Sequence, residues 1–190
     1  MTRELWDREA ETFDDEPDHG LADPVTRRAW RDLLLGALPP APARIADIGS
    51  GTGTLARLLV DEGYSVAGLD LSPEMVARAR LKVPEATFTV GDASEPRLDD
   101  TAYDVVLSRH VLWAMPDPET AFARWVGLLG PDGVVVLVEG SWHTGAGLTA
   151  AECERIVRTV RTDATVRHLT EPVYWGRPID DERYLLVSRA

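Results

Sequence analysis

Three aspartates and a run of glycines are the residues whose types and spacing could do chemistry in this sequence. Asp47 stands two residues before Gly49, and Gly51 and Gly53 follow at alternate positions. Glycines in such a turn let a ligand approach bare backbone at the carboxyl end of a parallel strand. Because a carboxylate stands at the mouth of this turn, we expect a ligand that is cationic there.

The spacing of the glycines argues against a dinucleotide site. The dinucleotide fingerprint requires a third small residue for close helix–strand packing, and that place falls on Thr54. A carboxylate beside a pyrophosphate would also repel it by roughly 1 to 4 kcal/mol at ~4 Å. A nicotinamide-dependent oxidoreductase is therefore the weaker alternative, and selective binding of that cofactor would revive it. A sulfonium cofactor that carries an amino group fits the acid better.

Two further acids end predicted strands. Residues 64–70 form a short apolar strand that closes on Asp70, which lies 17 residues beyond Gly53. That distance is close to the spacing at which an acid on the second strand takes a ribose diol. Residues 87–92 form a third strand that closes on Asp92. Parallel strands would deliver all of these acids to one edge of a sheet.

The elements that must position the acids alternate in type along the chain. We expect strands near residues 43–48, 65–69, 86–90, 103–108 and 133–139, and helices near 53–62, 73–81, 117–129 and 149–161. This alternation predicts an α/β fold with a parallel sheet covered by helices on both faces. Two last strands, near 165–169 and 182–189, should form a hairpin-like pair joined by a long loop.

Helix start signals support several of these elements. Asp23, Ser72 and Asp117 each precede a proline, which is the pattern of an N-cap followed by a first-turn proline. Thr149 is followed three residues later by Glu152, the spacing of a capping box.

The proline-rich stretch 38–42 is a stiff connector that can be neither helix nor central strand. We expect a helix near residues 2–14 and a loop at 16–20 before it. The chain 1–190 is then a single domain, in which 1–40 form an N-terminal helical cap or lid. Residues 41–190 form the Rossmann-like core.

Composition bounds the partners and the compartment. The formal net charge is −12, from 32 acidic and 20 basic residues, which opposes binding to nucleic-acid phosphates or anionic membranes. The single cysteine, Cys153, excludes a disulfide framework. There is no apolar run of ~18 residues, and the charged start lacks the apolar core of a signal peptide. We therefore expect a cytoplasmic protein without nucleic-acid or membrane partners.

Five motifs in sequence order resemble those of class I S-adenosylmethionine-dependent methyltransferases of the broad methyltransferase type 11 group. They are Ala46–Gly53, Gly68–Met75, Val90–Ala93, Tyr103–Ser108 and Leu129–Gly133. The resemblance implies a mostly parallel seven-stranded sheet with one reversed strand, and S-adenosyl-L-methionine as cofactor. It also implies methyl transfer to an oxygen or nitrogen of a small-molecule acceptor, by a monomer or homodimer. The alternative is a non-catalytic binder of the same cofactor, with a regulatory or partner role.

Matching residues to the family's motifs implies their roles toward the cofactor. Gly49, Gly51 and Gly53 would let it approach the backbone. Asp47 would interact with the methionine amino group, Asp70 would accept from both ribose hydroxyls, and Asp92 would accept from the adenine amino group. The alternative for Asp47, Asp70 and Asp92 is a turn role, since Asp is common at strand ends.

The same resemblance implies weaker roles for neighbouring residues. The backbone of Ala93 would read an adenine ring nitrogen, and Leu71 and Met75 would give apolar contact near the adenine. The carbonyls near Ser108 and Arg109 would face the methionine end. Arg109 could instead hold a substrate carboxylate or pair with one of the many acids.

Histidines and aromatic residues are the candidates for the acceptor side. A base is needed only if the nucleophile must lose a proton. His110, after the fourth strand, is the leading base candidate, and His143, after the fifth, is the second. His19 in the predicted lid is a candidate contact to substrate or cofactor. Structural or solvated roles are the alternatives for each of them, and His168 is expected to be structural.

Aromatic side chains could line a flat acceptor pocket. The candidates are Trp113, Trp142, Tyr174 and Trp175, all placed near strand ends, with core packing as the alternative. The histidines lack tight ligand spacing and no Cys/His cluster accompanies them, so we expect no metal. The negative net charge modestly favours a cationic acceptor.

Overall fold

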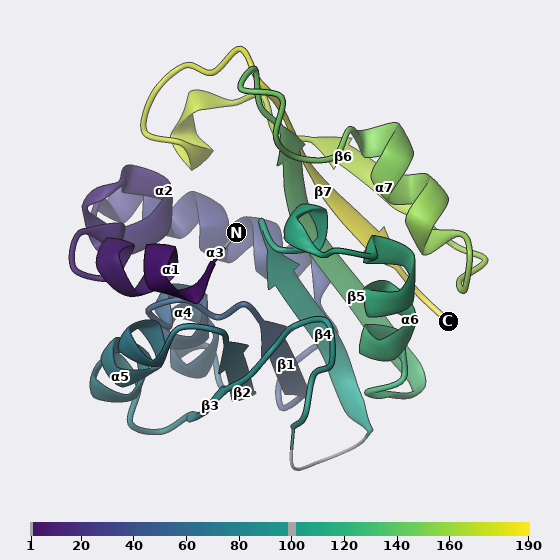
Figure 1. Ribbon diagram of the computed structural model, residues 1–190, viewed down its shortest axis with the longest axis horizontal. Coiled ribbons are helices and arrows are strands. Elements are labelled where there is room, and N and C mark those ends of the chain that lie inside the picture. Colours follow the sequence, from purple (N-terminus) through teal and green to yellow (C-terminus); the bar gives the residue numbers. More distant parts are fainter. Residues whose placement is uncertain (1, 99–101) are drawn as a thin grey trace.

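The computed structural model describes residues 2–98 and 102–190, which include one seven-stranded sheet (Figure 1). The strand order is β3-β2-β1-β4-β5-β7-β6. The strands are β1 Arg44–Ile48, β2 Ser65–Asp70, β3 Thr87–Val90, β4 Tyr103–Arg109, β5 Leu129–Ser141, β6 Thr165–His168 and β7 Glu182–Ser188. The first five strands pair in parallel, and β7 runs antiparallel to both β5 and β6. The predicted Rossmann-like sheet with one reversed strand is confirmed.

The helices lie near the predicted places, and most of them are shorter than predicted. They are α1 Arg3–Glu9, α2 Pro17–Gly20, α3 Pro24–Ala37, α4 Thr54–Asp61, α5 Pro73–Lys82, α6 Pro118–Val126 and α7 Ala150–Val157, with short 3₁₀ turns η1 Phe13–Asp15, η2 Leu112–Ala114 and η3 Pro172–Tyr174. The predicted helix 117–129 ends early because Leu129 already pairs with Tyr103 in the sheet.

The N-terminal segment departs most from the prediction. The helix expected near residues 2–14 ends at Glu9 and is followed by the separate turn η1. The loop expected at 16–20 is wrong, because Pro17 begins the short helix α2. The fixed backbone angle of proline suits the first position of a helix, so the same residue that reads as a loop signal starts a turn here.

The predicted helix caps are present. The side chains of Asp23, Ser72 and Asp117 each accept a hydrogen bond from a backbone N–H of the first turn that follows. Thr149 and Glu152 form both halves of the capping box. These bonds satisfy N–H groups that have no partner within the helix, and so fix where α3, α5, α6 and α7 begin.

Two apolar layers hold the sheet between the helices. Alternate strand residues point to opposite faces, so Ile45 and Val105 pack with α3, α4 and α5, whereas Ala46 and Val106 pack with α6 and α7. Figure 1 shows these two groups of helices on either side of the sheet. The sheet is therefore a rigid platform, and the predicted acids lie at its carboxyl-terminal edge, where the strands lead into loops.

Helices α1 and α2 lie beside this edge, next to α4 and α5 (Figure 1). The Asp7 carboxylate accepts a hydrogen bond of 2.6 Å from the Ser72 hydroxyl, which ties α1 to the start of α5. Across the described part of the chain, no helix combines the length and apolar character needed to cross a bilayer.

Candidate functional site

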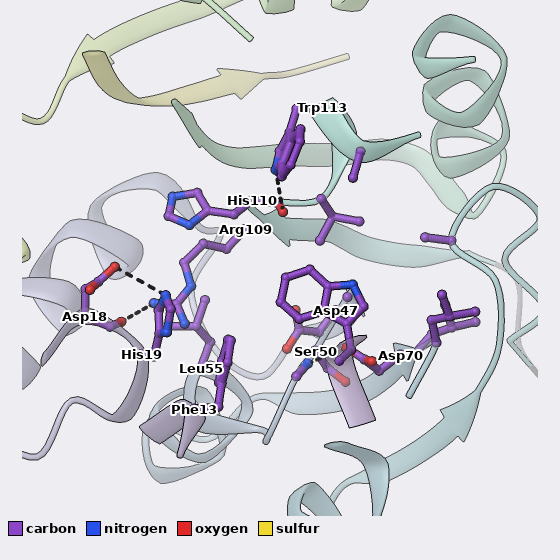
Figure 2. Close-up of a pocket in the computed structure, with 18 of the residues that line it drawn as sticks. Phe13, Asp18, His19, Asp47, Ser50, Leu55, Asp70, Arg109, His110 and Trp113 are labelled. Carbon is purple, nitrogen blue, oxygen red and sulfur yellow. Dashed lines mark hydrogen bonds and ion pairs between the residues drawn. The ribbon is translucent and has the colours of Figure 1, made fainter. Parts of the chain in front are cut away.

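A cavity of about 530 Å³ lies at the carboxyl ends of β1, β2, β3 and β4, under the N-terminal segment. Its wall contains most of the residues singled out from the sequence, and Figure 2 shows several of them. Those on the wall are His19, Asp47, Gly49, Gly51, Asp70, Leu71, Asp92, Ala93, Arg109, His110, Trp113 and Trp142. The structure thus brings the predicted cofactor acids and the leading base candidate into one space.

The glycine turn takes a backbone shape that other residues resist. Gly49, Gly51 and Gly53 have φ values of +75°, +53° and +79°. A Cβ at Gly49 would lie 2.2 Å from the Val111 side chain. A Cβ at Gly53 would lie 3.0 Å from Ala79 in α5, so this glycine serves helix packing and lies outside the cavity wall.

Asp70 organises the turn from the end of β2. One carboxylate oxygen accepts from the Gly51 N–H at 2.8 Å, and the other accepts from the Ser72 N–H at 2.9 Å. Burial raises the pKa of this carboxyl, and the backbone hydrogen bonds oppose the rise. The carboxylate is therefore held in one orientation on the wall, with its remaining lone pairs available to a ligand.

Asp47 is the least satisfied acid of the site. It is 2% exposed, and its Oδ2 has no hydrogen-bond partner among the residues that the structure describes. Burial raises its pKa to about 7, although the nearby Arg109 opposes the rise. A buried carboxylate without a partner is costly unless a cation completes it. The ammonium group of the implied sulfonium cofactor is such a cation, so these residues fit the cofactor.

Arg109 joins the end of β4 to the N-terminal segment. Its Nη1 donates to the backbone carbonyl of Asp18, and its guanidinium lies 5.2 Å from the centre of the Trp30 ring. Burial lowers its pKa, whereas the charges of Asp18 and Asp47 act in the opposite direction. Figure 2 shows its side chain between His110 and the Asp18–His19 pair.

His110 carries the strained backbone of the site. Its φ is +60°, a left-handed conformation that non-glycine residues adopt rarely and mostly where the surroundings enforce it. The ring meets Trp142 edge-on at 5.2 Å and stacks on Trp175 at 6.2 Å, and its Nε2 has no partner among the described residues. Burial, followed by the charges of Arg109 and Arg183, lowers the pKa of His110 well below 6.5.

Glu139, at the end of β5, supports the turn that follows His110. The side chain is buried, and its Oε1 accepts from the N–H groups of Val111 at 3.0 Å and Leu112 at 2.7 Å. Burial raises its pKa to about 8. Glu139 was not among the predicted site residues, although an acid directly after the five apolar residues Val134–Val138 is a signal visible in the sequence.

Replacing Glu139 with alanine should lower the free energy of unfolding by about 2–3 kcal/mol, because the buried N–H of Leu112 and the partly buried N–H of Val111 lose their acceptor. Glu139→Gln keeps an acceptor oxygen at this place, so it should lower the free energy of unfolding less than Glu139→Ala does. The folded wild type holds a proton on Glu139 up to about pH 8, whereas the unfolded chain releases it near 4.5. Wild-type stability therefore declines as pH rises between those values, and the glutamine variant lacks this part of the decline.

Denaturant unfolding of both variants at pH 6 and pH 9 measures these differences. Equal losses of unfolding free energy in Glu139→Ala and Glu139→Gln would contradict the role of Glu139 as a hydrogen-bond acceptor in the turn.

The N-terminal segment is fastened to the glycine turn by Lys82. Its Nζ donates to Asp14 at 2.6 Å and to the hydroxyls of Thr52 and Thr54 at 2.9 and 2.8 Å. Burial raises the pKa of Asp14, but the bonds from Lys82 and Thr52 prevail and lower it. This cluster holds Trp6, Phe13, Asp18 and His19 against the cavity, a set in which the sequence analysis identified only His19.

We predict that Lys82→Met loosens this segment. Removing the ammonium leaves Asp14 without its cation, so amide hydrogen exchange across residues 11–21 should rise several-fold. Lys82→Arg keeps the charge, so its amide hydrogen exchange should stay closer to that of the wild type. Unchanged exchange in Lys82→Met, measured by mass spectrometry, would show that other contacts hold the segment.

Some predicted site residues lie away from the cavity wall. The side chain of His143 is 74% exposed, and its Nδ1 lies 2.5 Å from Asp181 Oδ1. Ser108 is buried and donates to the Ile48 carbonyl at 2.9 Å, and Met75 is buried in the first turn of α5. Sheet register and helix packing place the side chains of Ser108 and Met75 behind the wall, whereas His143 lies in the exposed loop that follows β5.

Two of the four aromatic candidates reach the wall, and two support it from behind. Trp113 and Trp142 line the cavity with their rings 5.4 Å apart. Tyr174 and Trp175 pack against Trp30, whose Nε1 donates to the Tyr174 carbonyl at 2.8 Å. The long loop between β6 and β7 therefore closes the core under α3.

Potential metal ligands do come together on the wall. One oxygen of Asp18 and one ring nitrogen each of His19 and His110 lie within 4.8 Å of one another. Arg183 Nη1 lies 3.8 Å from Asp18 Oδ2, a cation where a metal would compete. The expectation of no metal stays a prediction.

Comparison with known proteins identifies the family of this chain. Residues 46–137 match the family model described as a methyltransferase domain. A demethylmenaquinone methyltransferase of Renibacterium salmoninarum is 30% identical over 161 residues, covering 81% of this chain and 68% of the relative. An uncharacterized methyltransferase of Mycobacterium bovis is 37% identical over 107 residues, covering 56% of this chain. The match takes in only 42% of that mycobacterial relative.

Solved structures share the fold. A TehB-like S-adenosylmethionine-dependent methyltransferase of Corynebacterium glutamicum has a TM-score of 0.67 at 26% identity, covering 85% of this chain and 94% of the other. The N-methyltransferase NodS of Bradyrhizobium japonicum has a TM-score of 0.74 at 18% identity and 97% coverage of both chains. With the glycine turn, the acids at the strand ends and these matches together, the chain belongs to the class I S-adenosylmethionine-dependent methyltransferases.

Proposed function

We propose that the protein transfers a methyl group from S-adenosyl-L-methionine to an oxygen or nitrogen of a small molecule. The observation that carries the proposal is the buried Asp47 carboxylate, whose Oδ2 has no hydrogen-bond partner among the described residues and which shares one cavity with the neutral His110. When bound, the cofactor supplies an electrophilic methyl group on a sulfonium centre.

The acids at the strand ends would hold the cofactor. Asp47 would pair with the methionine ammonium, and Asp70 would accept from the ribose hydroxyls. Asp92 accepts from the Ser94 N–H at 2.8 Å, which fixes its turn, and Trp125 Nε1 donates to the Ala93 carbonyl at 2.7 Å. Ordered donors and acceptors of this kind let binding orient the methyl group without further rearrangement.

His110 would serve the acceptor. Because its pKa lies well below 6.5, the imidazole is neutral near pH 7 and can take a proton from an attacking hydroxyl or amine. Trp113 and Trp142 would give the acceptor a flat apolar surface, and the N-terminal segment would exclude water. We infer no nucleic-acid partner from the net charge of −12.

Relatives point to small acceptors of different chemistry. Their names describe methyltransferases of demethylmenaquinone and, at 33% identity over 117 residues in Variovorax paradoxus, of trans-aconitate. A diversity of acceptors on one cofactor site is the general behaviour of a shared fold, in which loops set specificity.

The test is release of S-adenosylhomocysteine from S-adenosylmethionine in the presence of phenols, carboxylic acids, amines or azoles. Turnover on one class supports the proposal and fixes the acceptor chemistry. Cofactor binding without turnover on any class would favour a non-catalytic binder, and failure to bind the cofactor would refute the proposal.

A further inference from the structure

Arg183 is a second buried group on the cavity wall that lacks a full set of partners. It is the second residue of β7, pairs in register with Gly140 of β5, and is 9% exposed. A Cβ at Gly140 would lie 2.7 Å from the backbone carbonyl oxygen of Glu182, so the glycine allows the close approach of β5 and β7 beside Arg183.

Both terminal nitrogens of the guanidinium already lie near carboxylates. Nη1 lies 3.8 Å from Asp18 and Nη2 lies 3.3 Å from Asp181, and the group sits 4.5 Å from the centre of the Trp175 ring. Nε, by contrast, is buried and has no partner among the described residues. Because an arginine Nε–H can only donate, whatever completes it must bring an acceptor atom.

The charges around His110 show what kind of acceptor atom fits. Arg109 and Arg183 both act on the His110 ring in the direction that disfavours its cationic form. Arg177 also lines the cavity. These arginines favour an anionic oxygen over a neutral one beside His110, while the carboxylates of Asp18 and Asp181 offset part of the charge of Arg183. The negative charge of the whole chain, which favoured a cationic acceptor, is thus not reproduced at this point of the wall.

We propose that the methyl acceptor carries a carboxylate, which accepts a hydrogen bond from Arg183 Nε beside His110. The proposal rests on the proposed methyl transfer and names the substrate class of that same site. A charge-assisted bond to a planar guanidinium would orient the acceptor through a group separate from the cofactor pocket around Asp47. The carboxylate would also raise the pKa of His110 toward neutrality, where a general base is most effective.

The experiment uses the full chain saturated with S-adenosylhomocysteine. The probes are acetate and benzoate, with acetamide and benzamide as neutral matches. The ring signals of the 4 histidines are followed by NMR as each probe and the pH are varied. We expect benzoate to bind better than benzamide and to raise the pKa of His110 by on the order of one unit.

Arg183→Met should weaken benzoate binding about tenfold or more, while the affinity for S-adenosylhomocysteine stays within about twofold. Arg183→Lys keeps the charge, so its affinity for benzoate should lie between those of the wild type and Arg183→Met. The matched control is Arg167→Met, since Arg167 also lies over an aromatic ring, at 5.9 Å from the centre of Tyr174, but is not on the cavity wall. It should bind benzoate like the wild type.

Equal binding of benzoate and benzamide would overturn the proposal, as would absence of binding by either carboxylate at about 10 mM. A loss of S-adenosylhomocysteine affinity in Arg183→Met, with benzoate binding intact, would overturn it by assigning the arginine to the cofactor. Failure of the wild type to bind S-adenosylhomocysteine at all would instead refute the methyltransferase proposal beneath it.

Discussion

Asp47→Asn should weaken binding of S-adenosylhomocysteine by roughly 30-fold or more, the largest effect expected on the cofactor. The amide keeps the shape of the side chain but removes the charge that a buried ammonium would pair with, and breaking such a pair costs about 2–5 kcal/mol. Titration calorimetry at pH 8, where Asp47 is ionised in the wild type, measures the difference.

The same variant should change the response to pH. The pKa of Asp47 is raised from 3.8 to about 7 in the folded protein. Between these values the folded protein holds a proton that the unfolded chain has released, so the free energy of unfolding declines as pH rises toward 7. Without ligand, Asp47→Asn should lack this part of the decline and gain stability relative to the wild type on going from pH 4 to pH 8.

Affinity should follow the opposite course in the wild type. Protonated Asp47 no longer attracts an ammonium, so binding of S-adenosylhomocysteine should weaken as pH falls below about 7. Asp47→Asn should bind weakly at every pH. An asparagine variant with unchanged affinity would show that the ligand's ammonium lies elsewhere.

His110→Asn should lower the rate of methyl transfer about 10²- to 10⁴-fold on an acceptor that must lose a proton. Asparagine is chosen because it tolerates the left-handed backbone, here φ +60°, better than alanine does. The affinity for S-adenosylhomocysteine should stay within about twofold, since the ring faces the acceptor end. Single-turnover kinetics with the acceptor found in the release assay measures the effect.

The pH profile and a second histidine separate catalysis from structure. Because the pKa of His110 lies well below 6.5 in the absence of acceptor, kcat/KM should not fall between pH 7.5 and 6.5 on account of this residue. His143→Ala is the control, as that side chain is 74% exposed and off the wall, and its activity should match the wild type. Equal losses in both variants would contradict a base at His110.

The cofactor half of the site could be predicted from the sequence because each of its motifs spans only a few residues. Asp47, Asp70 and Asp92 each lie within two residues of the end of a strand, and parallel strands must place their carboxyl ends at one edge. The acceptor half depends on contacts between distant segments and was only partly readable. His143 follows β5 and Trp175 lies in the loop between β6 and β7, yet the side chain of His143 is exposed and the ring of Trp175 stacks on His110.

The sequence by itself determined the strand and helix alternation, the helix caps and the cofactor acids, because hydrophobic period, capping and turn chemistry act over a few residues. Only the tertiary structure decided which groups are buried without partners. Nothing in the sequence distinguishes Glu139 and Arg183 from other charged residues. In the folded protein Glu139 is buried against the turn after His110, and Arg183 is buried against Trp175. Desolvation depends on every segment that packs around a group, and in this protein those segments come from both ends of the sequence.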